Sequence, residues 1–131
     1  MLGTAAVAEG VRLLAEAGIG RLRDKGMRLT DYLIGLADDW LAPLGFALAS
    51  PRPAKDRGSH VCLRHPEAWR LSQALIEAGV IGDYRTPGRL RLGAAPITTR
   101  YADVWDAMEA TRRIVASRGY EDFPAEPAQV T

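Results

Sequence analysis

The residues with the widest range of chemistry stand close together at one place in the chain: His60, Cys62 and His65. A cysteine nucleophile needs a histidine base that a third side chain orients, and no nearby aspartate or asparagine supplies that third group. As zinc ligands, three side chains along one strand and its exit would not converge on a tetrahedral centre. The pattern therefore favours a half-buried structural thiol, and we expect neither a catalytic residue nor a metal site here.

Arg91 is the stronger candidate for a functional residue. It alternates with Leu90 and Leu92, so if the two leucines enter the core, Arg91 points from the other face of a strand. The planar guanidinium binds a carboxylate through two parallel hydrogen bonds, and a strand holds it more rigidly than a loop does. From the residues alone, a solvated arginine paired with a neighbouring acid stays an equal alternative. Arg89 competes for the same role at the same face, and Arg85 lies on the paired strand.

The first 41 residues are predicted to be helical. Two apolar stripes have helical spacing, the first made of Val7, Val11, Leu14, Gly18 and Leu22 and the second of Leu29, Leu33, Leu36 and Trp40. Gly18 and Gly20 weaken the helix between the stripes, and Pro43 and Gly45 end it. One long bent helix and a pair of helices both remain open.

Beyond Pro43 the apolar pattern becomes that of short strands. We predict strands at residues 46–50, 59–64, 80–85 and 89–93, with a hairpin loop at residues 86–88. Helices are predicted from Pro66 to a C-cap at Gly79 and from about residue 100 to 118. The last helix has its predicted apolar side at Tyr101, Val104, Trp105, Met108 and Val115.

This order of elements predicts an α+β fold. A small antiparallel or mixed sheet of about four strands, covered on one face by helices, would occupy residues 42–119. A helical segment at residues 1–41 would precede it, and a flexible tail at residues 120–131 would follow.

Composition excludes several classes of protein. The chain has 131 residues, of which 47% are hydrophobic and 25% charged, as in an ordinary globular domain. The net charge of +1 gives no reason to expect nucleic acid or an anionic membrane as a partner. We find no membrane-spanning stretch and no secretory signal, and a single cysteine suits the reducing cytoplasm.

Five blocks of sequence, in order and at suitable spacing, resemble the C-terminal part of bacterial kynureninases. They are KGMRLTDYLI at 25–34, RGSHVCLRHP at 57–66, GVIGDYR at 79–85, LRLGAAP at 90–96 and YADVWD at 101–106. The resemblance runs from about residue 2 to residue 115. A related desulfurase or class V aminotransferase would share the architecture but not these blocks of sequence.

The resemblance implies the small domain of a pyridoxal-phosphate enzyme of the aspartate-aminotransferase fold type. Kynureninases hydrolyse L-kynurenine to anthranilate and L-alanine in tryptophan catabolism, and they act as homodimers. Their cofactor lysine and phosphate-binding residues lie in a large domain, which would be the missing N-terminal partner of this chain. The chain has 15 arginines but only two lysines, Lys25 and Lys55, and neither has the buried setting of a cofactor lysine. We therefore expect it to bind no pyridoxal phosphate and to be inactive alone.

By the same resemblance, Arg91 matches the family's arginine that binds the α-carboxylate of the substrate. We expect its guanidinium to project from the sheet with no carboxylate partner inside the chain. Arg57, Gly58 and Ser59 are expected to shape the loop that enters the strand at 59–64, with no catalytic role. The alternatives are a free-standing α+β module that binds another protein and has lost catalysis, or the small domain of a related aminotransferase or desulfurase.

Overall fold

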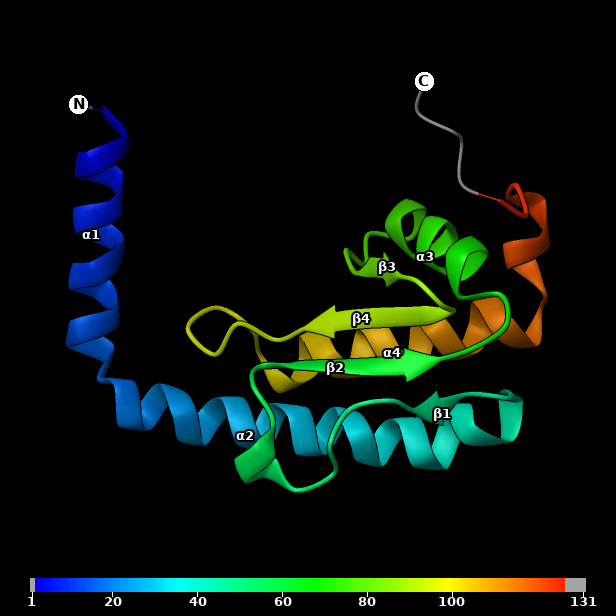
Figure 1. The fold of residues 1–131 in the computed structure, drawn as a ribbon, viewed down its shortest axis with the longest axis horizontal. Helices are drawn as coiled ribbons and strands as arrows, with labels where there is room; N and C mark the ends of the chain where they lie inside the picture. The colour runs from blue at the N-terminus through cyan, green and yellow to red at the C-terminus, as the bar shows by residue number, and fades with distance from the viewer. Residues whose placement is uncertain (1, 127–131) are drawn as a thin grey trace.

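The computed structural model describes residues 2–126, and its first two elements are helices that meet at Gly18 (Figure 1). These are α1 (Leu2–Ala17) and α2 (Ile19–Leu36). Gly18 has a φ of 83°, a conformation that glycine adopts without steric cost. The two apolar stripes therefore belong to a pair of helices. α1 extends away from the rest of the chain, and its side chains from residue 6 to residue 16 are exposed.

The predicted end of the second helix is confirmed near Pro43 and Gly45. A π-helical turn (Ala37–Leu41) and a 3-10 turn (Ala42–Leu44) follow α2 directly. Gly45 then reverses the chain with a φ of 93° and leads it into the first strand.

Within residues 2–126, the sheet has four antiparallel strands in the order β1-β2-β4-β3. Their bounds are Ala47–Leu48 for β1, His60–Arg64 for β2, Asp83–Arg85 for β3 and Arg89–Gly93 for β4. Helix α3 (Ala68–Glu77) connects β2 to β3, and α4 (Tyr101–Ala116) follows β4. The α+β class and the order of its elements are confirmed.

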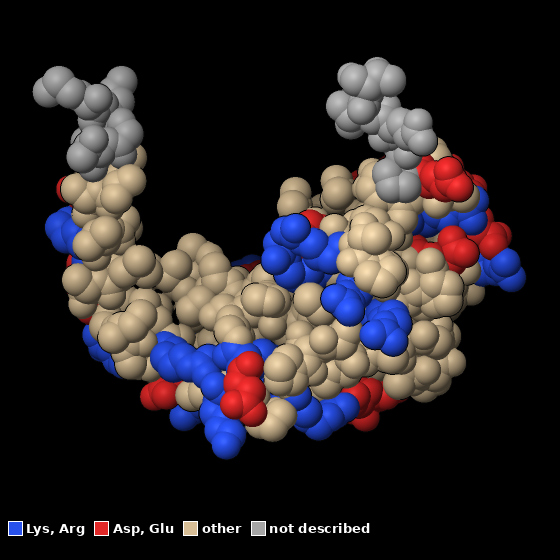
Figure 2. All heavy atoms as spheres, in the orientation of Figure 1, with Lys and Arg blue, Asp and Glu red and all other residues tan. Residues whose placement is uncertain are grey.

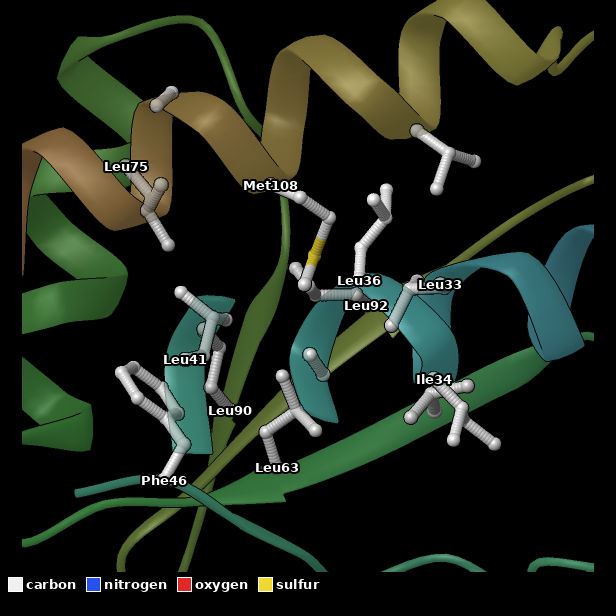
Figure 3. Packing of buried hydrophobic residues seen from close by; sticks show 14 of the residues in the cluster. Leu33, Ile34, Leu36, Leu41, Phe46, Leu63, Leu75, Leu90, Leu92 and Met108 are labelled. Atoms are coloured by element: carbon white, nitrogen blue, oxygen red, sulfur yellow. The ribbon is translucent and has the colours of Figure 1, made fainter. Parts of the chain in front are cut away.

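Helices α2, α3 and α4 cover one face of this sheet, and the core lies between them. Val61 and Leu63 of β2 and Leu90 of β4 are at most 1% exposed. Figure 3 shows Leu63, Leu90 and Leu92 of the sheet facing Leu33 and Met108 of the helices. Burial of each such side chain stabilises the fold by about 1.5–3 kcal/mol relative to exposure. Among the residues that the structure describes, no helix covers the opposite face of the sheet (Figure 1).

The structure differs from the sequence prediction at the edge of α4. Tyr101 and Trp105 were predicted on its apolar side, but they are 45% and 46% exposed. Each packs edge to face on an aromatic ring of the α2 region, with ring centroids 5.7 Å apart for Tyr101 and Tyr32 and 4.5 Å apart for Trp105 and Trp40. They lie at the border of the core because an edge-to-face contact between two rings can form while one ring edge stays exposed to water.

Part of the predicted tail has regular structure. Residues Gly119–Asp122 form a 3-10 turn, and the backbone carbonyl of Phe123 accepts a hydrogen bond of 2.9 Å from Nε of Arg70 on α3. Two parts of the predicted segments lie outside the described residues, namely residue 1 and residues 127–131. The predicted division of the chain into three segments, at residues 41 and 119, stays a prediction. Between residues 2 and 126, no helix is both long enough and apolar enough to cross a bilayer.

Candidate functional site

The uncovered face of the sheet brings the candidate residues together. Alternation along β2 and β4 turns Val61, Leu63, Leu90 and Leu92 toward the helices and leaves His60, Cys62, Arg64, Arg89 and Arg91 on the other face. The strand register arranges this face in rows. Cys62 lies opposite Arg91, which lies opposite Asp83 on β3, and the next row is Arg64, Arg89 and Arg85. The predicted orientation of Arg91, away from the two leucines, is therefore confirmed.

Arg91 forms a two-pronged ion pair with Asp83. Its Nε donates to Oδ1 of Asp83 at 2.9 Å, and its Nη2 donates to Oδ2 at 2.6 Å. Our expectation that Arg91 has no carboxylate partner inside the chain is wrong. The reason is the hairpin register, which places Asp83 directly across the strand pair from Arg91. The side chains of Arg91 and Asp83 are 37% and 40% exposed, so the pair is accessible from solvent.

Arg85 shares the same carboxylate, with its Nη2 2.9 Å from Oδ2 of Asp83. The hydrogen bonds from Arg91 hold the pKa of Asp83 below its usual range, and those bonds raise the pKa of Arg91. The carboxylate is thus ionised at neutral pH. Two guanidinium groups against one carboxylate leave this cluster with a net positive charge.

The neighbouring row adds to that positive charge. Arg64 and Arg89 form no ion pair within residues 2–126, and Nε of Arg89 is buried without a hydrogen-bond partner there. Figure 2 shows blue side chains gathered over the middle of this face. Arginines directly opposite one another on neighbouring strands repel, so the face is suited to an anion that lies between them.

Cys62 and His60 share this face of the sheet, but His65 does not. The Cys62 thiol is free and half-buried, and its backbone N–H donates to Oγ of Ser50 at 2.8 Å. His60 is exposed on the same face of the sheet, whereas His65 is buried against Phe46, with ring centroids 4.5 Å apart. Within residues 2–126, no group of three or more His, Cys, Asp or Glu side chains is placed to hold a metal ion.

Arg57 has the structural role that was expected of its segment. Its side chain is only 2% exposed, and the guanidinium donates to the carbonyl oxygens of Pro51 and Arg52 in its own loop. It also contacts Oγ1 of Thr30 and forms an ion pair with Asp31, both on α2. Two of the sequence blocks that carry the resemblance therefore touch through Arg57, which fixes the loop before β2 to the long helix.

A second concave region lies on the helix-covered side. It is a cleft of about 550 Å³ between the segment from Gly79 to Ile81, the end of β4 and helix α4, and its lining includes Asp106 and Arg113. Leu92 also lines it, and the side chain of that residue points away from the face that carries Arg91. The cleft is separate from the arginine cluster.

Comparison with known proteins identifies the family. The model of the kynureninase C-terminal domain matches residues 22–111, which include every strand and most of the core. The chain belongs to the kynureninase family. It is 34% identical to a kynureninase of Geobacillus thermodenitrificans over 126 residues, which are 96% of this chain and 29% of that protein. It is 41% identical to a kynureninase of Pseudomonas fluorescens over 106 residues, 81% of this chain and 26% of that protein.

The chain therefore spans less than a third of the length of these kynureninases and corresponds to their C-terminal domain. The family that the sequence blocks indicated is confirmed. Sequence reasoning missed Asp83, although a signal for it was present. With a three-residue loop at 86–88, Arg85 pairs with Arg89, and counting two residues outward on each strand pairs Asp83 with Arg91.

Proposed function

We propose that this chain is the part of a pyridoxal-phosphate-dependent kynureninase that binds the α-carboxylate of L-kynurenine, with Arg91 as the binding residue. One observation carries the proposal: Arg91 presents an incompletely used guanidinium on the open face of the sheet. Its Nη1 forms no hydrogen bond within the described residues, and the side chain is 37% exposed. The position of Arg91 in the block at residues 90–96 supports the same assignment.

The residues of this chain do not fit the cofactor itself. Pyridoxal phosphate supplies an electron sink when it is bound, and it needs a lysine beside the substrate. Lys25 lies on α2 near Arg21, Asp24 and Arg28, and Lys55 is exposed in a 3-10 turn (Ala54–Asp56). Neither is on the face that carries Arg91. In this proposal the cofactor is held by the part of a kynureninase that lies outside this chain.

The chemical contribution of this chain is to bind and orient the substrate. A carboxylate bound through two parallel N–H donors is fixed in both position and rotation, and the bond that reacts is thereby held in one orientation. The strand supports this role because Arg91 lies in β4, which is paired with β2 on one side and with β3 on the other. The net positive charge of the cluster attracts the carboxylate group of the substrate.

Helix α1 supports a larger assembly. Val7, Val11 and Leu14 of the predicted stripe are 66%, 59% and 46% exposed, and α1 stands apart from the core (Figure 1). An apolar stripe left in water on an isolated helix indicates a surface that is covered in the working protein. We propose that the rest of a homodimeric kynureninase, its large domain or the second subunit, covers it in the cytoplasm.

The test is kinetic. In a full-length kynureninase that carries this chain as its C-terminal part, Arg91→Ala should lower kcat/KM for kynurenine about a hundredfold or more, because a charge-assisted contact to the substrate is lost. Cofactor absorbance should be retained. Arg52→Ala is the matched control, since Arg52 also forms an exposed two-pronged pair, with Asp38. A near-normal kcat/KM in the Arg91 variant would refute the assignment.

A further inference from the structure

We propose that Asp83 is a positioning residue, which holds one edge of the Arg91 guanidinium so that the other edge faces the substrate carboxylate. The inference rests on the proposed function, because it assumes that Arg91 binds that carboxylate. It adds a residue for which neither the sequence blocks nor the comparisons suggest a role.

The geometry of the guanidinium carries the argument. An arginine has two edges that can each bind a carboxylate with two parallel N–H donors, one formed by Nε and Nη2 and one formed by Nη1 and Nη2. Asp83 occupies the first edge, with oxygens 2.9 Å from Nε and 2.6 Å from Nη2. The second edge remains available, since Nη1 has no partner within the described residues and Nη2 has a second hydrogen.

Asp83 is itself fixed in place. Its backbone lies in β3 directly opposite Arg91, and its Oδ2 also forms an ion pair with Nη2 of Arg85 at 2.9 Å. The carboxylate is therefore held from two sides, and Arg91 cannot swing freely into solvent. Because Arg85 balances the charge of Asp83, the positive charge of Arg91 stays available to an incoming anion.

A competing arrangement would have the substrate displace Asp83 from Arg91. The two arrangements predict opposite effects of removing the Asp83 charge. If Asp83 positions Arg91, its loss weakens substrate binding, since the guanidinium must then be ordered by the substrate itself. If Asp83 competes for Arg91, its loss strengthens substrate binding.

The experiment is Asp83→Asn in a full-length kynureninase that carries this chain. Asparagine keeps the shape of the side chain and removes its charge. We expect KM for kynurenine to rise about tenfold with kcat nearly retained. Equilibrium binding of kynurenine should weaken to the same degree, whereas binding of the analogue that lacks the α-carboxyl group should not change. Asp38→Asn is the control, because Asp38 forms a two-pronged pair with Arg52 away from the sheet.

An unchanged or lowered KM in Asp83→Asn would overturn the inference, as would an equal loss of binding for both ligands. The failure of the proposed function looks different. If Arg91→Ala leaves kcat/KM and kynurenine binding unchanged, Arg91 is not the carboxylate-binding residue. If Arg91→Ala is strongly impaired and Asp83→Asn is not, only the role of Asp83 is refuted.

Discussion

Arg57→Met tests whether the buried guanidinium fastens the loop before β2 to helix α2. Methionine has a similar length and is apolar, so it fills the same space and removes the charge and its hydrogen bonds. Arg57 is 5% exposed. Its guanidinium donates to the carbonyl oxygens of Pro51 at 3.0 Å and Arg52 at 2.5 Å, and it pairs with Asp31.

The expected loss of unfolding free energy depends on the groups that lose Arg57 as their partner. Breaking a buried ion pair by removing one member costs about 3–5 kcal/mol, because the other member is left uncompensated. Asp31 is 57% exposed and regains water, and the two carbonyl groups are only partly buried. The loss should therefore lie at the lower end of that range, near about 3 kcal/mol. This is a large fraction of the total stability of a domain, about 5–15 kcal/mol.

Urea unfolding of the wild-type chain and the variant, followed by circular dichroism, measures the difference in unfolding free energy. The control is Arg52→Met, which removes another paired arginine whose side chain is 61% exposed. An exposed pair contributes little to stability, so the control should unfold close to the wild type. If Arg57→Met has the same unfolding free energy as Arg52→Met, the guanidinium does not fasten the loop.

Two further predictions concern pH and local stability. Burial lowers the pKa of His65 below its usual range, so the unfolded chain binds more protons there, and the unfolding free energy should fall as pH drops below about 6.5. His65→Gln should remove this slope in urea titrations while His60→Gln, at an exposed position, keeps it. In the isolated chain, amide hydrogens of residues 6–16 should exchange far faster than those of α2 from Leu29 to Leu36, because a short helix without packing is marginal in water. Equal protection of α1 and α2 would contradict this.

Periodicity predicted the elements whose burial depends on local spacing alone. Leu29, Leu33 and Leu36 repeat at helical intervals and all lie in the core, and Val61 and Leu63 alternate into it from β2. Such residues face one way because of helix and strand geometry, whatever they pack against. The choice between one bent helix and two helices depended instead on the φ of Gly18. The sequence does not determine this angle, because glycine adopts positive and negative φ with similar ease.

The candidate site was only half predictable for a different physical reason. That Arg91 leaves the core follows from alternation with its neighbours, and its functional role came from resemblance. Its partner depends on register between two strands, and a shift of one residue would have put the side chain of Asp83 on the other face. The contact of Arg57 with Thr30 and Asp31 joins residues 26 and 27 positions apart, which no local pattern encodes.

The ion pair with Asp83 shows that an arginine proposed to bind a ligand can already have a carboxylate partner when no ligand is bound. We expected an arginine without a partner because its ligand is absent, yet such a side chain would sample many rotamers in water and would lose that freedom on binding. An arginine held along one edge has already lost it. The strand sets the position of Arg91, Asp83 sets its rotation, and Arg85 offsets the charge of Asp83. On this reasoning, occupation of one edge prepares the other, and an ion pair whose side chains are 37% and 40% exposed is compatible with the proposed binding of a carboxylate by Arg91.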